Sequence, residues 1–302
     1  MRKTSQLSPE DRNIRIYETL FSWILKFFSV LVVATLVGIL ATILIQALPS
    51  FRDAGINFYT GKSWDPVFKH FSATPFVVGT LATTVLALLI SIPFSLSIAL
   101  FSGFYLHPGR ITSTIRLLID LLAGIPSVIY GFWGLSIVVP AVRQFELFSG
   151  RVPYGVGIFT AALILSIMIV PYAASIGRDV IALVPSDLKE AGLALGATPY
   201  EVVRWIVMPY SKAGLLSGIL LSFGRAIGET MAVTMVIGNA NKIPGSIFDP
   251  ANTISSIIAN EFAEATDPIY VSHLIHMGLI LFISTTAIGL FGRRVIKKWS
   301  SH

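Results

Sequence analysis

The sequence contains no cysteine and few charged residues among its 302 positions. Without cysteine, disulfide bonds, thiolate catalysis and sulfur-ligated metals are excluded. The HExxH pattern of zinc proteases and the GxSxG pattern of serine hydrolases are absent too, which argues against a membrane-embedded enzyme. Charged residues make up 13% of the chain and hydrophobic residues 54%, with a mean hydropathy of +0.77. A composition this apolar excludes a soluble domain and indicates a membrane protein with several spans.

The N-terminal segment, residues 1–22, is polar and is not expected to be a cleavable signal peptide, since the apolar run after it is long enough to span a bilayer. Ser8 is expected to cap a helix in this segment. Ile14, Tyr17 and Phe21 then share one helical face. We therefore predict an amphipathic segment that lies along the membrane surface on the cytoplasmic side.

Six apolar stretches predict an all-α polytopic protein with a transmembrane domain over residues 23–294 and a cytoplasmic tail over residues 295–302. The expected spans are residues 23–48, 74–101, 114–139, 154–176, 213–237 and 268–291.

An even number of spans places both termini on one side of the membrane. Of the 22 Lys and Arg residues, fifteen fall on the side of the termini and six on the other, with Arg225 inside a span. Positive charge accumulates on cytoplasmic loops, so both termini are predicted to be cytoplasmic. The net charge of +6 then reflects contact with lipid, and no nucleic-acid partner is expected.

A polar island, residues 186–209, interrupts the apolar chain on the cytoplasmic side. Ser186 is expected to cap a first short helix, and Gly196 suits the left-handed residue that ends it. Thr198 and Glu201 form a capping-box pattern that starts a second helix. The pattern predicts a helix-turn-helix knob. A DNA-reading role is disfavoured, because the knob is tethered to the bilayer at both ends and has no basic cluster; an ordinary amphipathic loop is the plain alternative.

The spacing within this knob resembles the EAA loop of bacterial ABC importer permeases, which reads Glu-Ala-Ala, three residues, Gly, nine residues, Ile-x-Leu-Pro. The residues that carry the spacing are Glu190, Ala191, Gly192, Gly196, Ile206 and Pro209. Two positions depart from it, with Gly192 in place of the second Ala and Met208 in place of Leu. The resemblance implies an ABC importer type I permease fold and a knob that docks into a cytoplasmic ATPase subunit.

The fifth expected span contains Arg225 and Glu229, four residues apart. On a continuous helix these side chains share a face and can pair. A charge within the bilayer costs about 2.5–3.5 kcal/mol on insertion scales, so such residues pair or line a polar path. Both readings stay open here: a substrate path, or an ion pair that only fixes helix packing.

The third expected span contains Pro126, which removes a backbone hydrogen bond and can open a kink. Ser127 and Tyr130 then lie near a freed carbonyl group and are candidates for lining a path, although a plain kink with satisfied hydroxyls fits as well. Asp120 is a weaker candidate and is positioned to pair with Arg116, four residues earlier.

Two segments narrow the resemblance. Residues 224–239, GRAIGETMAVTMVIGN, resemble span five of the permeases of the phosphate-specific ABC transporter, and their ending is more similar to the C-type subunit than to the A-type. Residues 121–134, LLAGIPSVIYGFWG, resemble the third span of the same family.

That family resemblance implies a subunit of an ATP-driven phosphate importer in the bacterial inner membrane. Its expected partners are an A-type permease, an ATP-binding subunit dimer, an extracytoplasmic phosphate-binding protein and membrane lipid. ATP is bound by the ATPase, so no cofactor is expected in this chain. Two alternatives remain: an importer of another oxyanion such as sulfate or molybdate, and a non-conducting sensory subunit.

The outer loop over residues 239–267 is expected to carry a short surface helix, because Ile254, Ile257 and Ile258 have helical spacing. This loop could receive a substrate-delivering protein or simply be solvated. His273 and His276 follow it at a spacing that can ligate a metal. No third ligand is near them, so they are predicted to be interfacial histidines.

Overall fold

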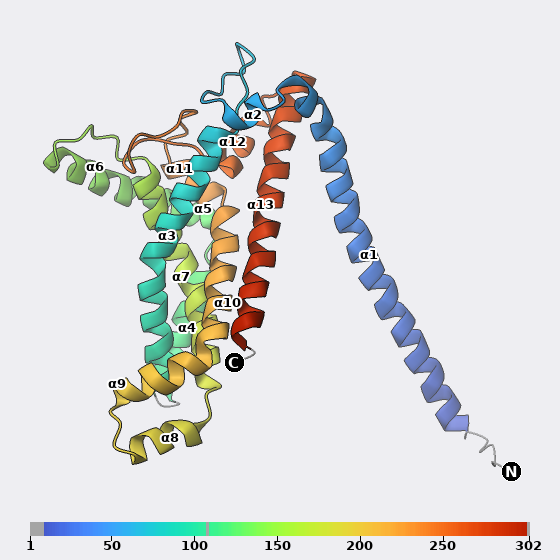
Figure 1. Ribbon diagram of the computed structural model, residues 1–302, viewed down its shortest axis with the longest axis vertical. Helices are drawn as coiled ribbons and strands as arrows, with labels where there is room; N and C mark the ends of the chain where they lie inside the picture. The colour runs from blue at the N-terminus through green and yellow to red at the C-terminus, as the bar shows by residue number, and fades with distance from the viewer. Residues whose placement is uncertain (1–8, 107–108, 301–302) are drawn as a thin grey trace.

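The computed structural model describes residues 9–106 and 109–300 (Figure 1). Apart from isolated β-bridges in the loops, all regular structure in these residues is helical, which confirms the predicted all-α class. Six helical stretches in the described chain are long and apolar enough to cross a membrane. They are Tyr17–Asp53, Thr74–Tyr105, Ser127–Phe148, Ile158–Ala182, Pro199–Ile227 and Pro268–Lys298.

Helix α1 (Pro9–Asp53) leans away from the rest of the molecule (Figure 1). The C-terminal end of α1 packs on α13 (Pro268–Ser300). It runs without a break through residue 22, so the predicted surface segment and the first span form one helix. The predicted cap at Ser8 lies outside the described residues. The exposed apolar side chains along α1 are those of a helix surrounded by lipid.

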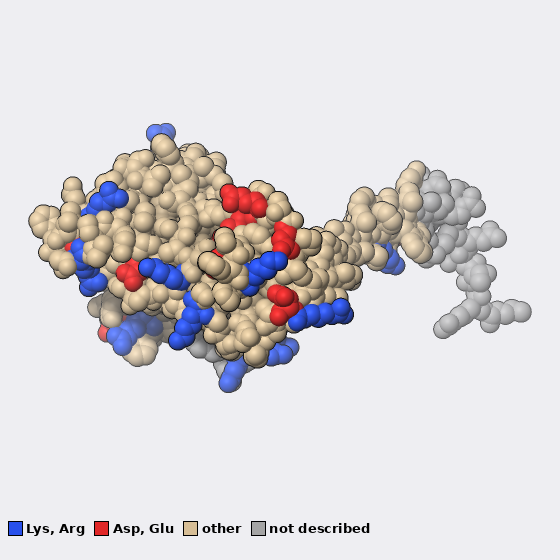
Figure 2. All heavy atoms as spheres, turned by 90° about the horizontal axis from the view of Figure 1, so that it is seen from above, with Lys and Arg blue, Asp and Glu red and all other residues tan. Residues whose placement is uncertain are grey.

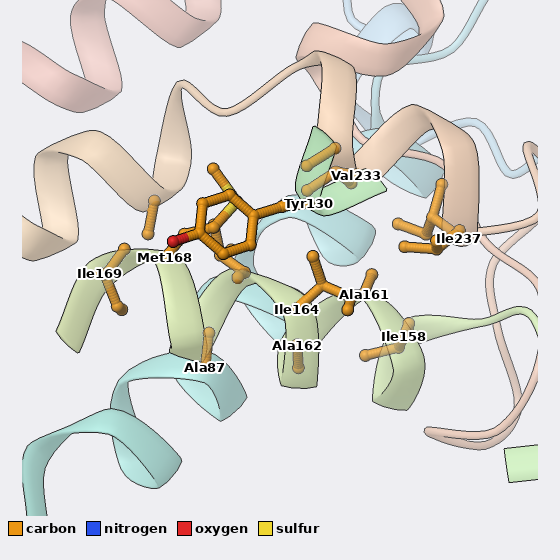
Figure 3. Close-up of a cluster of buried hydrophobic side chains, with 14 of the residues drawn as sticks. Ala87, Tyr130, Ile158, Ala161, Ala162, Ile164, Met168, Ile169, Val233 and Ile237 are labelled. Atoms are coloured by element: carbon orange, nitrogen blue, oxygen red, sulfur yellow. The ribbon is translucent and has the colours of Figure 1, made fainter. Parts of the chain in front are cut away.

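Helix α7 (Ile158–Ala182) is the centre of the bundle and packs between α3 (Thr74–Leu100) and α10 (Met208–Ile227). Small residues on α7 permit this close approach, since a Cβ added to Gly177 would lie 2.8 Å from Ala99 Cβ. Figure 3 shows the buried cluster that results. Its members include Ala87, Tyr130, Ala161, Ala162, Ile164, Met168 and Val233.

The predicted third span is wrong as a continuous helix. The region consists of α4 (Arg110–Gly124), α5 (Ser127–Trp133), the π-helix η2 (Gly134–Val138) and α6 (Val139–Phe148). Ile125 and Pro126 are extended, because a residue before proline is pushed out of the helical region and proline donates no hydrogen bond. The candidate membrane span begins after this break, at Ser127.

The predicted fifth span is displaced. Helix α9 (Pro199–Val202) continues through the π-helix η3 (Val203–Val207) into α10, so the second helix of the knob and the span are one rod. The rod ends at Ile227, before the predicted limit, and a short helix α11 (Met231–Val236) follows. The chain is therefore interrupted within the stretch that hydropathy alone marks as one span.

The end of the molecule opposite the knob is closed by loops and two short helices, α2 (Asn57–Thr60) and α12 (Ile254–Glu261) (Figure 1). Helix α12 confirms the helix predicted in the outer loop. Glu261 ties these loops together, because its carboxylate accepts hydrogen bonds from Trp64 Nε1 at 2.8 Å, Asn241 Nδ2 at 3.1 Å and the Tyr270 hydroxyl. Figure 2, which looks onto this end, shows acidic and basic side chains interspersed on an otherwise uncharged surface.

His273 and His276, predicted to be interfacial histidines, lie near the start of α13 at this end of the molecule and are fully buried, with their rings stacked on Phe71 and Phe58 respectively. His276 Nδ1 lies 2.9 Å from Ser50 Oγ, and its Nε2 lies 2.7 Å from Tyr59 Oη. His273 Nε2 lies 3.5 Å from an Asp53 carboxylate oxygen. The histidines thus join α13 to the end of α1, and the described residues contain no group of three His, Asp or Glu side chains suited to a metal.

Candidate functional site

The second helix of the knob begins with the predicted capping box. The Thr198 hydroxyl accepts the Glu201 main-chain N–H at 3.3 Å, and the Glu201 carboxylate accepts the Thr198 main-chain N–H at 2.7 Å. Pro199 occupies the first turn, where no N–H is needed. These reciprocal bonds fix the angle at which the chain enters the rod.

The first helix of the knob, α8 (Ser186–Ala194), ends as predicted but begins differently. Gly196 has φ +90°, and the Ala197 N–H donates to the Gly192 carbonyl at 3.1 Å, a left-handed helix end of the Schellman type. The predicted cap at Ser186 is wrong. Pro185 occupies that position, and the Ser186 hydroxyl donates to the Asp187 carboxylate at 3.3 Å.

The two knob helices pack on each other through Gly192. A Cβ added at this position would lie 2.7 Å from the Ile206 Cδ1 atom and 3.2 Å from Val202 Cγ2. Glycine therefore admits the Ile206 side chain more closely than alanine does, which accounts for the departure of Gly192 from the Glu-Ala-Ala pattern. Val202 and Val207 continue this contact into the base of α7 at Ile181, so the knob is attached firmly to the bundle.

The knob exposes several large apolar side chains. We call the exposed side chains Leu195, Tyr200 and Trp205 the knob face; 90% of the Leu195 surface is exposed. Glu190 and Ala191 are exposed on α8 beside it. An apolar surface at the polar end of a membrane protein is typical of a protein-binding site.

Lys189 is half-buried, whereas the other charged residues of α8, Asp187 and Glu190, are exposed. Its ammonium group lies 5.9 Å from the centre of the Phe104 ring, within the π-helix η1 (Phe101–Tyr105) that ends α3. Burial lowers the pKa of Lys189 below its ordinary value. The knob therefore contacts the ends of α3 and α7 as well as the rod.

Pro209 is accommodated by the π-helix that precedes it. A proline inside an α-helix clashes with the carbonyl four residues earlier, and the wider turn of η3 (Val203–Val207) is placed where that clash would occur. The rod thus passes Pro209 without ending, and Ile206 keeps its contact with Gly192.

Arg225 lies in the last turn of the rod, on the wall of an open pocket of about 530 Å³. The pocket is lined by Tyr172, Leu220, Leu221, Gly224, Arg225, Gly228 and Glu229. The guanidinium carbon lies 4.7 Å from the centre of the Tyr172 ring. The Arg225 Nε–H is buried and has no hydrogen-bond partner among the described residues. A buried donor left unpaired is costly, so this conformation leaves part of the Arg225 guanidinium unsatisfied.

The predicted ion pair between Arg225 and Glu229 is wrong for this conformation. The described ion pairs do not include it, because the rod ends at Ile227 and Glu229 is no longer one helical turn from the arginine. The Ser255 hydroxyl donates to the Glu229 main-chain carbonyl at 2.7 Å, and the Glu229 carboxylate accepts the Ala232 N–H at 3.4 Å. Glu229 is therefore held at the start of α11, where the helix dipole favours a negative charge.

The break at Pro126 removes the N–H donors that would continue α4, and tyrosine hydroxyls donate to two carbonyls at its end, although the Leu122 carbonyl also accepts the Ile125 N–H at 3.4 Å. Tyr130 is buried and its hydroxyl donates to the Leu122 carbonyl at 2.9 Å, as expected of a residue near a freed carbonyl. Tyr172 donates to the Ala123 carbonyl at 3.2 Å. Ser127, at the start of α5, is half-buried.

Asp120 is exposed on α4, and the described ion pairs do not join it to Arg116 as predicted. Sequence reasoning missed Tyr172, which the structure places at both the pocket and the α4 break. The available signal was a tyrosine directly after Pro171, in the middle of a mostly apolar stretch.

Comparison with known proteins agrees with these features. Residues 91–297 match the family described as "Binding-protein-dependent transport system inner membrane component". The chain belongs to this family. The family match contains the whole knob and the pocket residues, and it makes this chain a multi-pass membrane component of a transporter rather than an enzyme.

Relatives of the chain within this family carry the name "Phosphate transport system permease protein PstC". One from Pasteurella multocida is 40% identical over 99% of this chain and 97% of its own length. One from Haemophilus influenzae is 41% identical over 93% of each chain. The fold resembles that in the crystal structure of a bacterial ABC transporter involved in the import of the acidic polysaccharide alginate, with a TM-score of 0.64 at 16% identity over 94% of this chain and 99% of that chain. The predicted resemblance to C-type phosphate permeases is confirmed.

Proposed function

We propose that this chain is one permease subunit of an ATP-driven importer of inorganic phosphate. It forms the translocation path with a second, A-type permease, accepts phosphate from an extracytoplasmic binding protein and is driven by a dimer of cytoplasmic ATPase subunits that bind the ATP. The names and the end-to-end similarity of the relatives support phosphate as the substrate. The observation that carries the proposal is Arg225 itself, a cationic residue in the wall of an open pocket within a membrane span, with no ion pair among the described residues.

In the proposed orientation the protein lies in the bacterial inner membrane with both termini and the knob in the cytoplasm. The distribution of Lys and Arg supports this orientation. The start of α1, the end of α13 and α8 lie toward the same end of the molecule (Figure 1). The loops around α12 then face the substrate-delivering protein.

Coupling to the ATPase runs through the knob face. The ATPase subunit docks on Leu195, Tyr200 and Trp205, beside Glu190 and Ala191 of the EAA pattern. Closure of the ATPase dimer on ATP displaces the knob, and a rigid-body motion of this kind switches the path between inward and outward access. The uninterrupted rod supports this step, since the 25 residues from Glu201 to Arg225 are separated by 24 helical rises and extend about 36 Å.

Arg225 serves as the positive partner for the anion. Moving an anion through an apolar medium without a partner is prohibitively costly, and the guanidinium fork matches the oxygens of phosphate. Glu229 lines the same pocket, so its negative charge opposes phosphate and keeps the site weak enough to release it. The hydroxyl groups of Ser127 and Tyr130 remain candidates for the rest of the path.

The test is Arg225→Gln in the complete complex, reconstituted in vesicles with its ATPase, partner permease and binding protein. Loss of one member of a close charge pair costs about 2–5 kcal/mol, so phosphate uptake is expected to fall at least about thirtyfold. Arg143→Gln is the matched control, because Arg143 is exposed and donates to the Tyr154 carbonyl outside the pocket. Normal uptake by assembled Arg225→Gln complex contradicts the role of Arg225, and uptake of labelled sulfate or molybdate instead of phosphate contradicts the substrate.

A further inference from the structure

Tyr172 makes two separate contacts that no other described side chain combines. On one side, its ring lies beneath the Arg225 guanidinium, 4.7 Å from ring centre to guanidinium carbon. On the other side, its hydroxyl donates to the Ala123 carbonyl of α4 at 3.2 Å. Tyr172 itself belongs to α7, the central helix. One side chain thus connects α4, α7 and the end of the rod.

The anchor on α4 exists because the helix is broken. Gly124 ends α4, and Pro126 cannot donate to the carbonyls of the preceding turn. Tyr130 satisfies the Leu122 carbonyl, which leaves the Ala123 carbonyl to Tyr172. The hydroxyl of Tyr172 therefore has an acceptor that the proline break makes available.

The ring contact suits an arginine that must bind an anion. A carboxylate partner would neutralise the guanidinium and occupy its N–H donors, whereas an aromatic face orients the cation and accepts none of those N–H groups in plane. Among the described residues Arg225 forms no ion pair with Glu229. The Tyr172 ring is therefore the contact that we assign to holding the Arg225 guanidinium at the pocket wall.

We propose that Tyr172 is a positioning residue for phosphate transport, which holds Arg225 in the pocket with its charge and donors free for the anion. The inference rests on the proposed role of Arg225 in phosphate binding. It assigns the ring, rather than Glu229, as the group that keeps Arg225 in place between transport cycles.

The test compares Tyr172→Leu and Tyr172→Phe in the complete complex, reconstituted in vesicles. Loss of the ring in Tyr172→Leu is expected to raise the phosphate concentration for half-maximal uptake about tenfold, equivalent to about 1.4 kcal/mol. Tyr172→Phe keeps the ring and loses only the hydroxyl anchor, so it is expected to stay within about threefold of the wild type. Phe223→Leu removes a half-buried aromatic side chain two residues from Arg225 and is the matched control.

The half-maximal phosphate concentration and the maximal uptake rate together distinguish a residue that positions Arg225 from one that only packs helices together. A side chain that only packs α7 against α4 would, when shortened, lower the amount of assembled complex or the maximal rate and leave the half-maximal concentration unchanged. That result overturns the inference, as does a Tyr172→Phe variant that is as impaired as Tyr172→Leu. If Arg225→Gln transports normally, the proposed function fails. If Arg225→Gln is impaired while Tyr172→Leu has wild-type constants, the inference about Tyr172 fails and the proposed function stands.

Discussion

The knob offers a test in which backbone conformation alone is changed. Gly196 has φ +90°, and no atom lies within 4 Å of the position that a Cβ would occupy. A substitution therefore meets no steric obstacle, and its whole effect comes from forcing an L-residue into a left-handed conformation. That costs about 1–2 kcal/mol for an ordinary residue. A β-branched residue is strained further, and asparagine less.

The expected consequence is local opening of α8. A cost of about 1–2 kcal/mol raises the open fraction about 5- to 30-fold, and the amide-exchange rates of α8 rise by the same factor when opening and closing are fast compared with the exchange reaction itself. The predicted order of exchange rates is Gly196→Val fastest, then Ala, then Asn, then wild type. ATP-driven phosphate uptake is expected to decline in the same order, because the knob face loses its fixed position against the ATPase.

Gly38→Ala is the control for this series. Gly38 also has open space around its Cβ position, but it lies within helix α1 without a positive φ. Alanine is favoured over glycine there by about 0.5–1 kcal/mol, so exchange in α8 and uptake should not change. Equal exchange rates in α8 for wild type and Gly196→Val would refute the reasoning, and normal uptake despite faster exchange would refute the coupling role.

Two further predictions concern the outer loops. Glu261→Gln replaces a carboxylate that accepts three hydrogen bonds with an amide that cannot accept them all, and it is expected to cost about 1–3 kcal/mol of stability. Thermal unfolding of the complex measures this cost, with Glu264→Gln as the control. Equal unfolding midpoints for the two variants would contradict the prediction. The hydrogen bond from the Ile269 N–H lowers the pKa of Asp267 below its ordinary value, and the hydrogen bond from Lys69 lowers it further to a smaller extent. The ionised Asp267 carboxylate therefore stabilises the folded loop at neutral pH, and this stabilisation is lost as the pH falls below about 4. In the wild type, protection of the Ile269 amide against hydrogen exchange should therefore decline at low pH, and Asp267→Asn should flatten this decline. Identical pH profiles of protection in the wild type and the variant would contradict the prediction.

The knob could be predicted in detail because its determinants are local. A capping box depends on residues three apart, and a left-handed helix end depends on one glycine, so Thr198, Glu201 and Gly196 are recognisable without the tertiary structure. The error at Ser186 has a local cause as well. Pro185 already supplies the extended residue before the helix, which shifts the helix start by one position.

The pocket could not be predicted to the same depth, because distant residues decide it. The apolar stretch continues on both sides of Gly228 and Glu229, yet the helix ends there. The Ser255 hydroxyl, 26 residues along the chain, donates a hydrogen bond to the Glu229 carbonyl. The contact of Tyr172 with Arg225 joins two different spans. Sequence identified the charges within the membrane, but their partners depend on where the two helices break and how α7 packs between them.

The position of these breaks bears on how the knob and the pocket communicate. From Pro199 to Ile227 the chain is one rod, so a displacement of the knob reaches Arg225 with little loss. Beyond the break, α11 is packed closely on α5, where a Cβ added to Gly131 would lie 2.7 Å from Met235 Sδ and 3.0 Å from Ala232 Cα. We therefore expect motion of the rod to be absorbed at the break rather than carried into α11. Arg225 then moves with the knob while Glu229 stays with α11, so ATP-driven motion changes the distance between the two charges that line the pocket.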